Sequence, residues 1–287
     1  MPRVLLLGLA LCRAATPGRG NSQQPNTDGA GAPPATGARL GDGREAVSVF
    51  PAGAIPSLTF IPADDGKGNG TLLAFSQFAG PRYGKAATPG CSSAVAHACD
   101  LGLRRSTDLG YSWSNATFPA LEATGKVAPW CCPQSVWDPH TQTVVVQFSN
   151  DTLTPKAKNG CDIHEEILGG VLQVKSHDRG RTWSQYLDVQ DQINFPRVAS
   201  GGDYRNSDCL APTSGKGVVM RPVNGKFGGR LVFCTARNAY QGDVVVYSDD
   251  GGRTYNFSKD LYVPGLDECS IGKLARELSR LVLCPSR

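Results

Sequence analysis

The sequence predicts an all-β protein built from repeated antiparallel sheets, and three observations lead to that prediction. Glycine accounts for 34 of 287 residues and charged residues for only 19%, a balance typical of chains rich in turns. Short apolar runs recur along the chain, whereas no long segment has the 3.6-residue period of a helix. One octapeptide pattern occurs three times, with starts 70 and 72 residues apart. Recurrence at a nearly fixed period indicates a repeat fold, here a β-propeller.

The octapeptide has the pattern S-x-D-x-G-x-[ST]-[WY] and occupies residues 106–113, 176–183 and 248–255. Its Asp and Ser can accept hydrogen bonds within a tight turn, and its Gly tolerates a positive φ. The aromatic residue supplies a large apolar group between strands. An apolar run precedes each octapeptide, so each unit is predicted to be strand, tight turn, strand. This structural role is favoured over the alternative, in which the aspartates bind calcium or take part in chemistry.

Further strands are predicted before and between the octapeptides, because short runs of β-branched and apolar residues occur there. Residues 165–168 are too short for a stable helix, so no helix is expected. Several short strands in each interval predict a four-stranded blade. The predicted strands cover residues 57–61, 71–75, 143–148, 217–220 and 230–233.

The N-terminus has the pattern of a secretory signal peptide over residues 1–14, with Arg3 followed by an apolar run and small residues. The alternative is an unstructured apolar N-terminus. Residues 15–46 are rich in Gly, Pro and Ala and are predicted to be a disordered linker, which leaves residues 47–287 for the propeller. No run approaches the ~20 apolar residues that a membrane-spanning helix needs. The predicted route leads to the lysosome or to the extracellular space.

Four glycosylation sequons and ten cysteines agree with a secretory route. Nine cysteines remain after the signal peptide, and this odd number predicts at least one free thiol or a missing partner. The sequons begin at Asn69, Asn115, Asn150 and Asn256, and the nine cysteines are Cys91, Cys99, Cys131, Cys132, Cys161, Cys209, Cys234, Cys269 and Cys284.

Composition and spacing argue against nucleic acid and metal partners. A formal net charge of +4 excludes a strongly basic nucleic-acid binder, which would carry a concentrated cationic face. No CxxC or HExxH spacing indicates zinc. His164 is interpreted as a loop residue rather than a ligand, and the cysteines as structural.

The octapeptides resemble the Asp-boxes (BNR repeats) of the sialidase superfamily, and the flanking motifs resemble those of animal lysosomal-type exo-α-sialidases. Residues 54–58 and 70–75 are similar to the family's opening R-I-P-x-L and G-x-L-L-A-F, and residues 103–106 lead into the first box as in that subgroup. Residues 266–269 resemble its D-E-C segment. The resemblance therefore implies an all-β, six-bladed β-propeller of sialidase type, with about three to four blades in residues 47–287.

The resemblance also implies an activity, the retaining hydrolysis of terminal α-linked sialic acids in glycoproteins, oligosaccharides and gangliosides, without a cofactor or metal. In the family, three arginines bind the substrate carboxylate, a tyrosine polarised by a glutamate attacks, and an aspartate is the general acid and base. Glu268 matches the glutamate, and Arg287 falls near the second arginine after a one-residue shift. Asp100 is the nearest carboxylate to the expected position of the acid, which is Val95.

The sequence departs from the family pattern at several positions. Ala54 stands where the first carboxylate-binding arginine is expected, and Val95 where the acid is expected. Arg82 and Arg104 are interpreted as surface or ion-pair arginines rather than as replacements. The third arginine and the nucleophilic tyrosine are expected beyond Arg287.

These departures keep three functional hypotheses open. The first is an exo-α-sialidase that acts on sialylated glycans, with peripheral membrane association left open. The alternative is a non-catalytic propeller that binds glycans or proteins, which Ala54 and Val95 favour. A third is a propeller glycosidase for neutral sugars, which would need no carboxylate-binding arginines.

Overall fold

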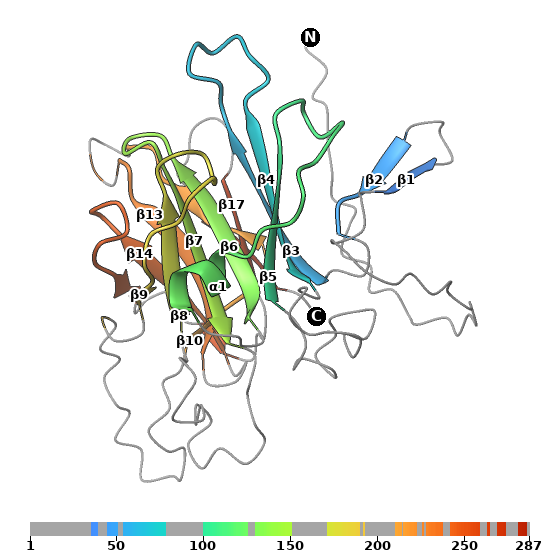
Figure 1. Ribbon diagram of the computed structural model, residues 1–287. Coiled ribbons are helices and arrows are strands. Elements are labelled where there is room, and N and C mark those ends of the chain that lie inside the picture. Colours follow the sequence, from blue (N-terminus) through green and yellow to red (C-terminus); the bar gives the residue numbers. More distant parts are fainter. Residues whose placement is uncertain are drawn as a thin grey trace, which may run out of the picture.

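The computed structural model shows an almost entirely β protein (Figure 1). Among the residues that it describes, no helix is both long and apolar enough to cross a membrane. The described residues are 36–39, 45–50, 54–78, 100–125, 130–150, 171–189, 192, 210–213, 215–222, 226, 228–237, 242–258, 263–264, 269–273 and 281–285.

The first sheet contains three antiparallel strands in the order β3 (Ala54–Ile61), β4 (Thr71–Phe78) and β5 (Asp100–Ser106). Its register pairs Ala54 with Gln77 and Phe78 with Asp100, so these residues share one end of the sheet, called here the Asp100 end. Ser106 begins the first octapeptide at the other end, called the repeat end. At about 3.3 Å per residue, the two ends of β5 lie about 20 Å apart.

The second and third sheets repeat this arrangement, with an octapeptide after the strand that leads to the repeat end. The second contains, in spatial order, β11 (Gly215–Lys216), β6 (Trp130–Asp138), β7 (Thr143–Asn150), β8 (Val171–Ser176) and β9 (Leu187–Asp188). The third contains the path β10 (Leu210–Pro212), β13 (Leu231–Arg237), β14 (Gly242–Ser248) and β15 (Asn256–Phe257), with β12 (Val218–Val219) on β13 and β16 (Val263–Pro264) on β14.

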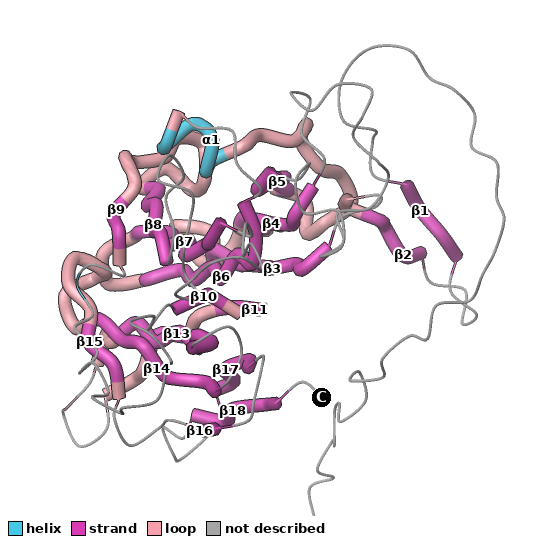
Figure 2. Tube along the Cα trace, turned by 90° about the horizontal axis from the view of Figure 1, so that it is seen from below, coloured by secondary structure: helices cyan, strands magenta, loops and turns pink. Residues whose placement is uncertain are grey.

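Two hairpins complete the described structure. In Figure 2 the sheets are stacked in chain order, with β17 (Cys269–Lys273) and β18 (Leu281–Pro285) next to the third sheet. The hairpin of β1 (Thr36–Arg39) and β2 (Glu45–Ser48) is set apart from the stack (Figure 2). This hairpin falls largely within the segment predicted to be disordered. Pairing of the two strands satisfies backbone hydrogen bonds, and composition alone does not predict such pairing.

The five further strands predicted before and between the octapeptides overlap β3, β4, β7, β12 and β13. Strand β6 was not predicted. Pro133 interrupts its sequence, and proline is unfavourable inside a sheet. The structure accommodates Pro133 in a β-bulge between Cys131 and Gln134, where Cys132 has a φ of 58°. The helix α1 (Pro119–Thr124) was also not predicted, because six residues are too few for a helical period.

Apolar side chains hold neighbouring sheets together face to face. Phe75 of the first sheet and Phe148 of the second are fully buried in one cluster. Val145 of the second sheet and Phe233 of the third share the next cluster. A third cluster joins the third sheet to Ile271 of β17. Each such side chain contributes about 1.5–3 kcal/mol when it leaves water, so the sheets are stable only when stacked.

The octapeptides form three equivalent turns that are held by their own side chains. In the first, Asp108 accepts hydrogen bonds from the amide and the hydroxyl of Ser112 at 2.9 and 2.5 Å, while the Ser106 hydroxyl accepts one from the amide of Gly110 at 2.8 Å. The same bonds recur around Asp178 and Asp250. The predicted structural role is therefore confirmed. The bonds from Ser112 and Ser106 lower the pKa of Asp108 to about 2.

Each turn also contains a second left-handed residue that the sequence did not predict. The glycine of the pattern has a φ between 78° and 94°, as expected. The residue before it is left-handed too, with φ values of 61° for Leu109, 62° for Arg179 and 69° for Gly251. A non-glycine residue is disfavoured in this region, so the turn stores strain at Leu109 and Arg179.

Consecutive turns are connected by the cation that precedes each of the first two octapeptides. Arg105, just before the first octapeptide, donates from Nε to the carbonyl of Arg179 in the second turn at 2.9 Å. Lys175, just before the second, donates from Nζ to the carbonyl of Gly251 in the third turn at 2.8 Å. The first sheet thus supplies a donor to the turn of the second, and the second sheet supplies one to the turn of the third.

Candidate functional site

The structure describes one of the three catalytic residues predicted from the sequence. Asp100 begins β5 at the Asp100 end and is only 2% exposed. Its Oδ1 accepts a hydrogen bond from the amide of Leu101 at 2.8 Å. Glu268 and Arg287 lie outside the described residues, as do Val95 and Arg82. The geometry therefore gives the position of the candidate acid relative to the sheets.

Ala54 lies at the same end of the first sheet as Asp100. It is the first residue of β3 and pairs with Gln77, whose neighbour Phe78 pairs with Asp100. A bulge between Ala54 and Ser57 shifts the register there. The alanine occupies the position expected for the first carboxylate-binding arginine, and a methyl group cannot form the paired hydrogen bonds of a guanidinium.

Arg104 does not compensate for this missing arginine. It is 2% exposed rather than at the surface, which corrects one part of the sequence interpretation. Its guanidinium lies 5.6 Å from the centroid of the Phe50 ring, an arrangement that favours a cation on an aromatic face. Burial lowers its pKa. Four residues of strand separate it from Asp100, or about 13 Å, so the two side chains do not meet at one small ligand group.

Tyr247 and Tyr255 are structural residues, as the sequence suggested. Tyr255 is 3% exposed and packs in the apolar cluster between the second and third sheets. Burial raises its pKa, and its hydroxyl donates to the side-chain oxygen of Gln173. Tyr247 packs flat against Arg230, whose guanidinium lies 4.0 Å from the ring centroid. Tyr255 is not suited to be a nucleophile because it is held neutral in the core, and the ring of Tyr247 is used in packing against Arg230.

A polar network joins β3 of the first sheet to β6 of the second. The Ser135 hydroxyl of β6 is within 2.7 Å of the Ser57 hydroxyl and 2.6 Å of the Thr59 hydroxyl of β3. The amide of Ser135 donates to Ser57 at 3.1 Å. All three residues are buried, so these bonds fix how the two strands face each other.

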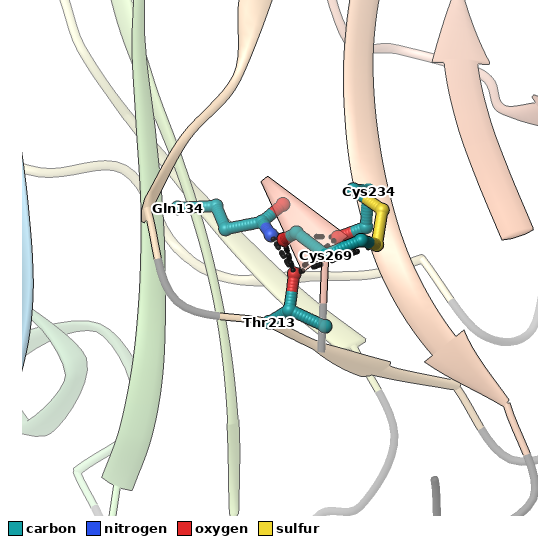
Figure 3. Close-up of a disulfide and its surroundings, with 4 residues drawn as sticks. All are labelled: Gln134, Thr213, Cys234 and Cys269. Carbon is teal, nitrogen blue, oxygen red and sulfur yellow. Dashed lines mark hydrogen bonds between the residues drawn. A yellow bond between two sulfur atoms is a disulfide. The ribbon is translucent and has the colours of Figure 1, made fainter. Parts of the chain in front are cut away.

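A second set of polar contacts joins the second and third sheets to β17, as Figure 3 shows. Gln134 of β6 donates from Nε2 to the Thr213 hydroxyl at 2.8 Å and to the carbonyl of Cys234 at 2.6 Å. Thr213 donates to the carbonyl of Cys269 at 2.5 Å. Cys234 and Cys269 form a disulfide with their Cα atoms 5.9 Å apart. Gln134, Thr213, Cys234 and Cys269 are called here the β17 anchor.

Sequence reasoning predicted paired cysteines and at least one free thiol or missing partner, but not the polar members of the β17 anchor. Within the described residues, Cys132 is a free and buried cysteine. Gln134 and Thr213 are single polar residues 79 positions apart. The weak signal in the sequence was the polar Gln134-Ser135 pair inside the run that forms β6.

The described residues hold one group of potential metal ligands, and it is not a metal site. Cys234, Cys269 and the buried carboxylate of Asp243 place ligand atoms within 4.8 Å of one another. Metal binding by cysteine requires a thiolate, and both sulfur atoms are used in the disulfide. A single carboxylate then remains, which is too few ligands for a protein metal centre.

A hollow of about 810 Å³ opens toward the repeat end, away from Asp100. It is lined by the ends of β3 and β6 and by the segment that follows β12. Phe60 is 47% exposed in this hollow, and most of the surface that lines the hollow is apolar. Its lining also includes the cationic residues Lys216 and Arg221, as well as Trp137 and Met220.

Comparison with known proteins shows the type of fold. No model of a protein family matches the chain, and no curated protein sequence matches it. Among solved structures, a Hadza microbial sialidase aligns with a TM-score of 0.55 and 20% identity over 77% of this chain. A Trypanosoma rangeli sialidase in complex with 2,3-difluorosialic acid, as the covalent intermediate, aligns with a TM-score of 0.53 and 15% identity over 86%. The chain spans 39% and 36% of their respective lengths. The chain therefore has a sialidase-type β fold.

Proposed function

We propose that this chain is part of an exo-α-sialidase that releases terminal α-linked sialic acids from glycoproteins, oligosaccharides and gangliosides. The observation that carries the proposal is the likeness of the described sheets to two solved sialidases at TM-scores above 0.5. The D-E-C segment, which contains Glu268, occurs at the position that the sequence resemblance requires. The reaction would proceed with retention, and the tyrosine nucleophile would lie in sequence beyond Arg287.

Three residues have proposed roles in this reaction. Asp100 would donate a proton to the leaving oxygen and then remove one from water, which is general acid and base catalysis. Glu268 would accept the proton of the attacking tyrosine. Arg287 would bind the substrate carboxylate through its guanidinium. Asp100 lies at the same end of the first sheet as Ala54, the position at which the family binds that carboxylate.

The test is turnover of a fluorogenic α-sialoside by the full-length protein that contains this chain, produced through a secretory host. Glu268→Gln should lower kcat by about 10²–10⁴-fold, as expected for loss of a general base. Glu122→Gln makes the same chemical change at an exposed position on α1 and should leave kcat unchanged. Equal activity of wild type and Glu268→Gln would refute the assigned role.

The second candidate is a non-catalytic propeller that binds sialylated glycans, and one observation favours it. Ala54 at the start of β3 removes a contact that charge-assisted hydrogen bonding makes worth about 1.5–3 kcal/mol. Binding to sialoglycans without turnover, and without affinity for an unsaturated sialic acid analogue, would select this candidate. A secretory destination, either lysosomal or extracellular, is proposed for both candidates from the N-terminal sequence and the sequons.

A further inference from the structure

The β17 anchor fixes the start of β17 from two directions. On one side, the disulfide ties Cys269 to Cys234 of β13, and both residues are buried. On the other side, the Thr213 hydroxyl donates to the carbonyl of Cys269 at 2.5 Å. The sulfur and the carbonyl of the same residue are therefore both held, so the backbone of Cys269 can neither rotate nor shift freely.

The side-chain amide of Gln134 connects the members of the anchor through hydrogen bonds. The Nε2 atom of Gln134 has two hydrogens, which it donates to the Thr213 hydroxyl at 2.8 Å and to the carbonyl of Cys234 at 2.6 Å. The Thr213 hydroxyl accepts a hydrogen bond from Gln134 and donates one to the carbonyl of Cys269. Gln134 thus holds both disulfide-bonded residues, Cys234 directly and Cys269 through Thr213.

The anchor is buried and connects three parts of the fold. Gln134 belongs to the second sheet, Cys234 to the third, and Cys269 to the following hairpin. Gln134 and Thr213 are 1% and 2% exposed. Buried hydrogen-bonding groups are costly to leave without partners, so the arrangement has little freedom to change.

We propose that Gln134 and Thr213 are positioning residues for Glu268, an inference that rests on the proposed sialidase function. Glu268 is bonded to Cys269, and a trans peptide sets consecutive Cα atoms about 3.8 Å apart. A shift of the Cys269 backbone would therefore be passed directly, through one peptide bond, to the glutamate. A misplacement of about 1 Å can reduce the rate of a catalysed reaction by about 10²-fold, so the anchor preserves rate rather than substrate affinity.

Thr213→Val tests the proposal, because it keeps the side-chain shape and removes the hydroxyl that joins Gln134 to Cys269. We expect hydrogen–deuterium exchange in residues 269–273 to become at least about tenfold faster, and kcat for a fluorogenic sialoside to fall by about 10–100-fold with KM within about twofold. Thr213→Ser retains the hydroxyl and should restore both measurements.

Thr59→Val is the matched control. Thr59, on β3, is also buried, and its hydroxyl forms a hydrogen bond with the Ser135 hydroxyl rather than with the anchor. The Thr59→Val variant should leave hydrogen–deuterium exchange in β17 and kcat near their wild-type values. The proposal is overturned if Thr213→Val behaves like Thr59→Val, or if Thr213→Val raises KM and leaves kcat unchanged. A full-length wild-type protein, containing this chain and the proposed tyrosine, that shows no turnover refutes the sialidase function, and unchanged exchange in β17 separately refutes the anchor.

Discussion

The glycine at position 180 offers the most direct test of how the octapeptide turns join the core. Gly180 has a φ of 78°, and a Cβ added there would lie 2.9 and 3.0 Å from the two terminal carbons of Leu73. Leu73 is fully buried in the cluster between the first and second sheets. Gly180→Ala therefore adds backbone strain of about 1–2 kcal/mol and overpacking of about 1–3 kcal/mol. The expected loss of stability is about 2–5 kcal/mol.

Gly66→Ala is the control for the backbone part of this loss. Gly66 has a φ of 66°, and an added Cβ would meet no atom within 4 Å. It should lose only the strain of about 1–2 kcal/mol. Denaturant unfolding monitored by tryptophan fluorescence would measure both variants, and Gly180→Ala should be the less stable by about 1–3 kcal/mol. Equal losses of stability in the two variants would show that a Cβ at position 180 does not overpack the core around Leu73.

Three further predictions concern the turns and their surroundings. Leu109→Gly should raise the free energy of unfolding by about 0.5–1 kcal/mol, because it relieves left-handed strain that exceeds the entropy cost of glycine; a loss of stability in the same unfolding assay would contradict this. The folded-state pKa of Asp108 is lowered from 3.8 to about 2, so its hydrogen bonds stabilise the fold above pH 3.8 and are lost as the pH falls toward 2. Asp108→Asn should therefore flatten the decrease in Tm between about pH 4 and 2, and an unchanged slope would refute the assignment. In a secretory host, replacing each exposed sequon asparagine with glutamine should remove one glycan by mass spectrometry, and an unchanged mass would show that the site is not used; these residues are Asn69, Asn115 and Asn256.

The sequence predicts the turns well because their bonds are local. In each octapeptide the Asp and its hydroxyl partner are four residues apart, as Asp108 and Ser112 are, so the pattern contains the whole hydrogen-bonding unit. The left-handed residue before the glycine escaped prediction, because leucine and arginine at that position disfavour the conformation that they adopt. There the bonds of the turn and its neighbours override the local preference.

The sequence predicts the long-range polar contacts poorly, because no local pattern carries them. Gln134 reaches Cys234 across 100 residues, and Ser57 reaches Ser135 across 78. Arg104 was interpreted as a surface or ion-pair arginine, whereas it is 2% exposed and its guanidinium lies over the Phe50 ring. For the candidate site, the sequence supplied Asp100, Glu268 and Arg287, and only the position of Asp100 is described.

The cations before the first two octapeptides imply an order of folding. The second turn receives its donor from Arg105 on β5, and the third turn receives its donor from Lys175 on β8. The bond that joins the second or the third turn to its donor can therefore form only after the preceding sheet has formed. We expect the chain to fold from its N-terminus toward its C-terminus, the direction in which the ribosome releases it, with each finished sheet acting as the template for the next.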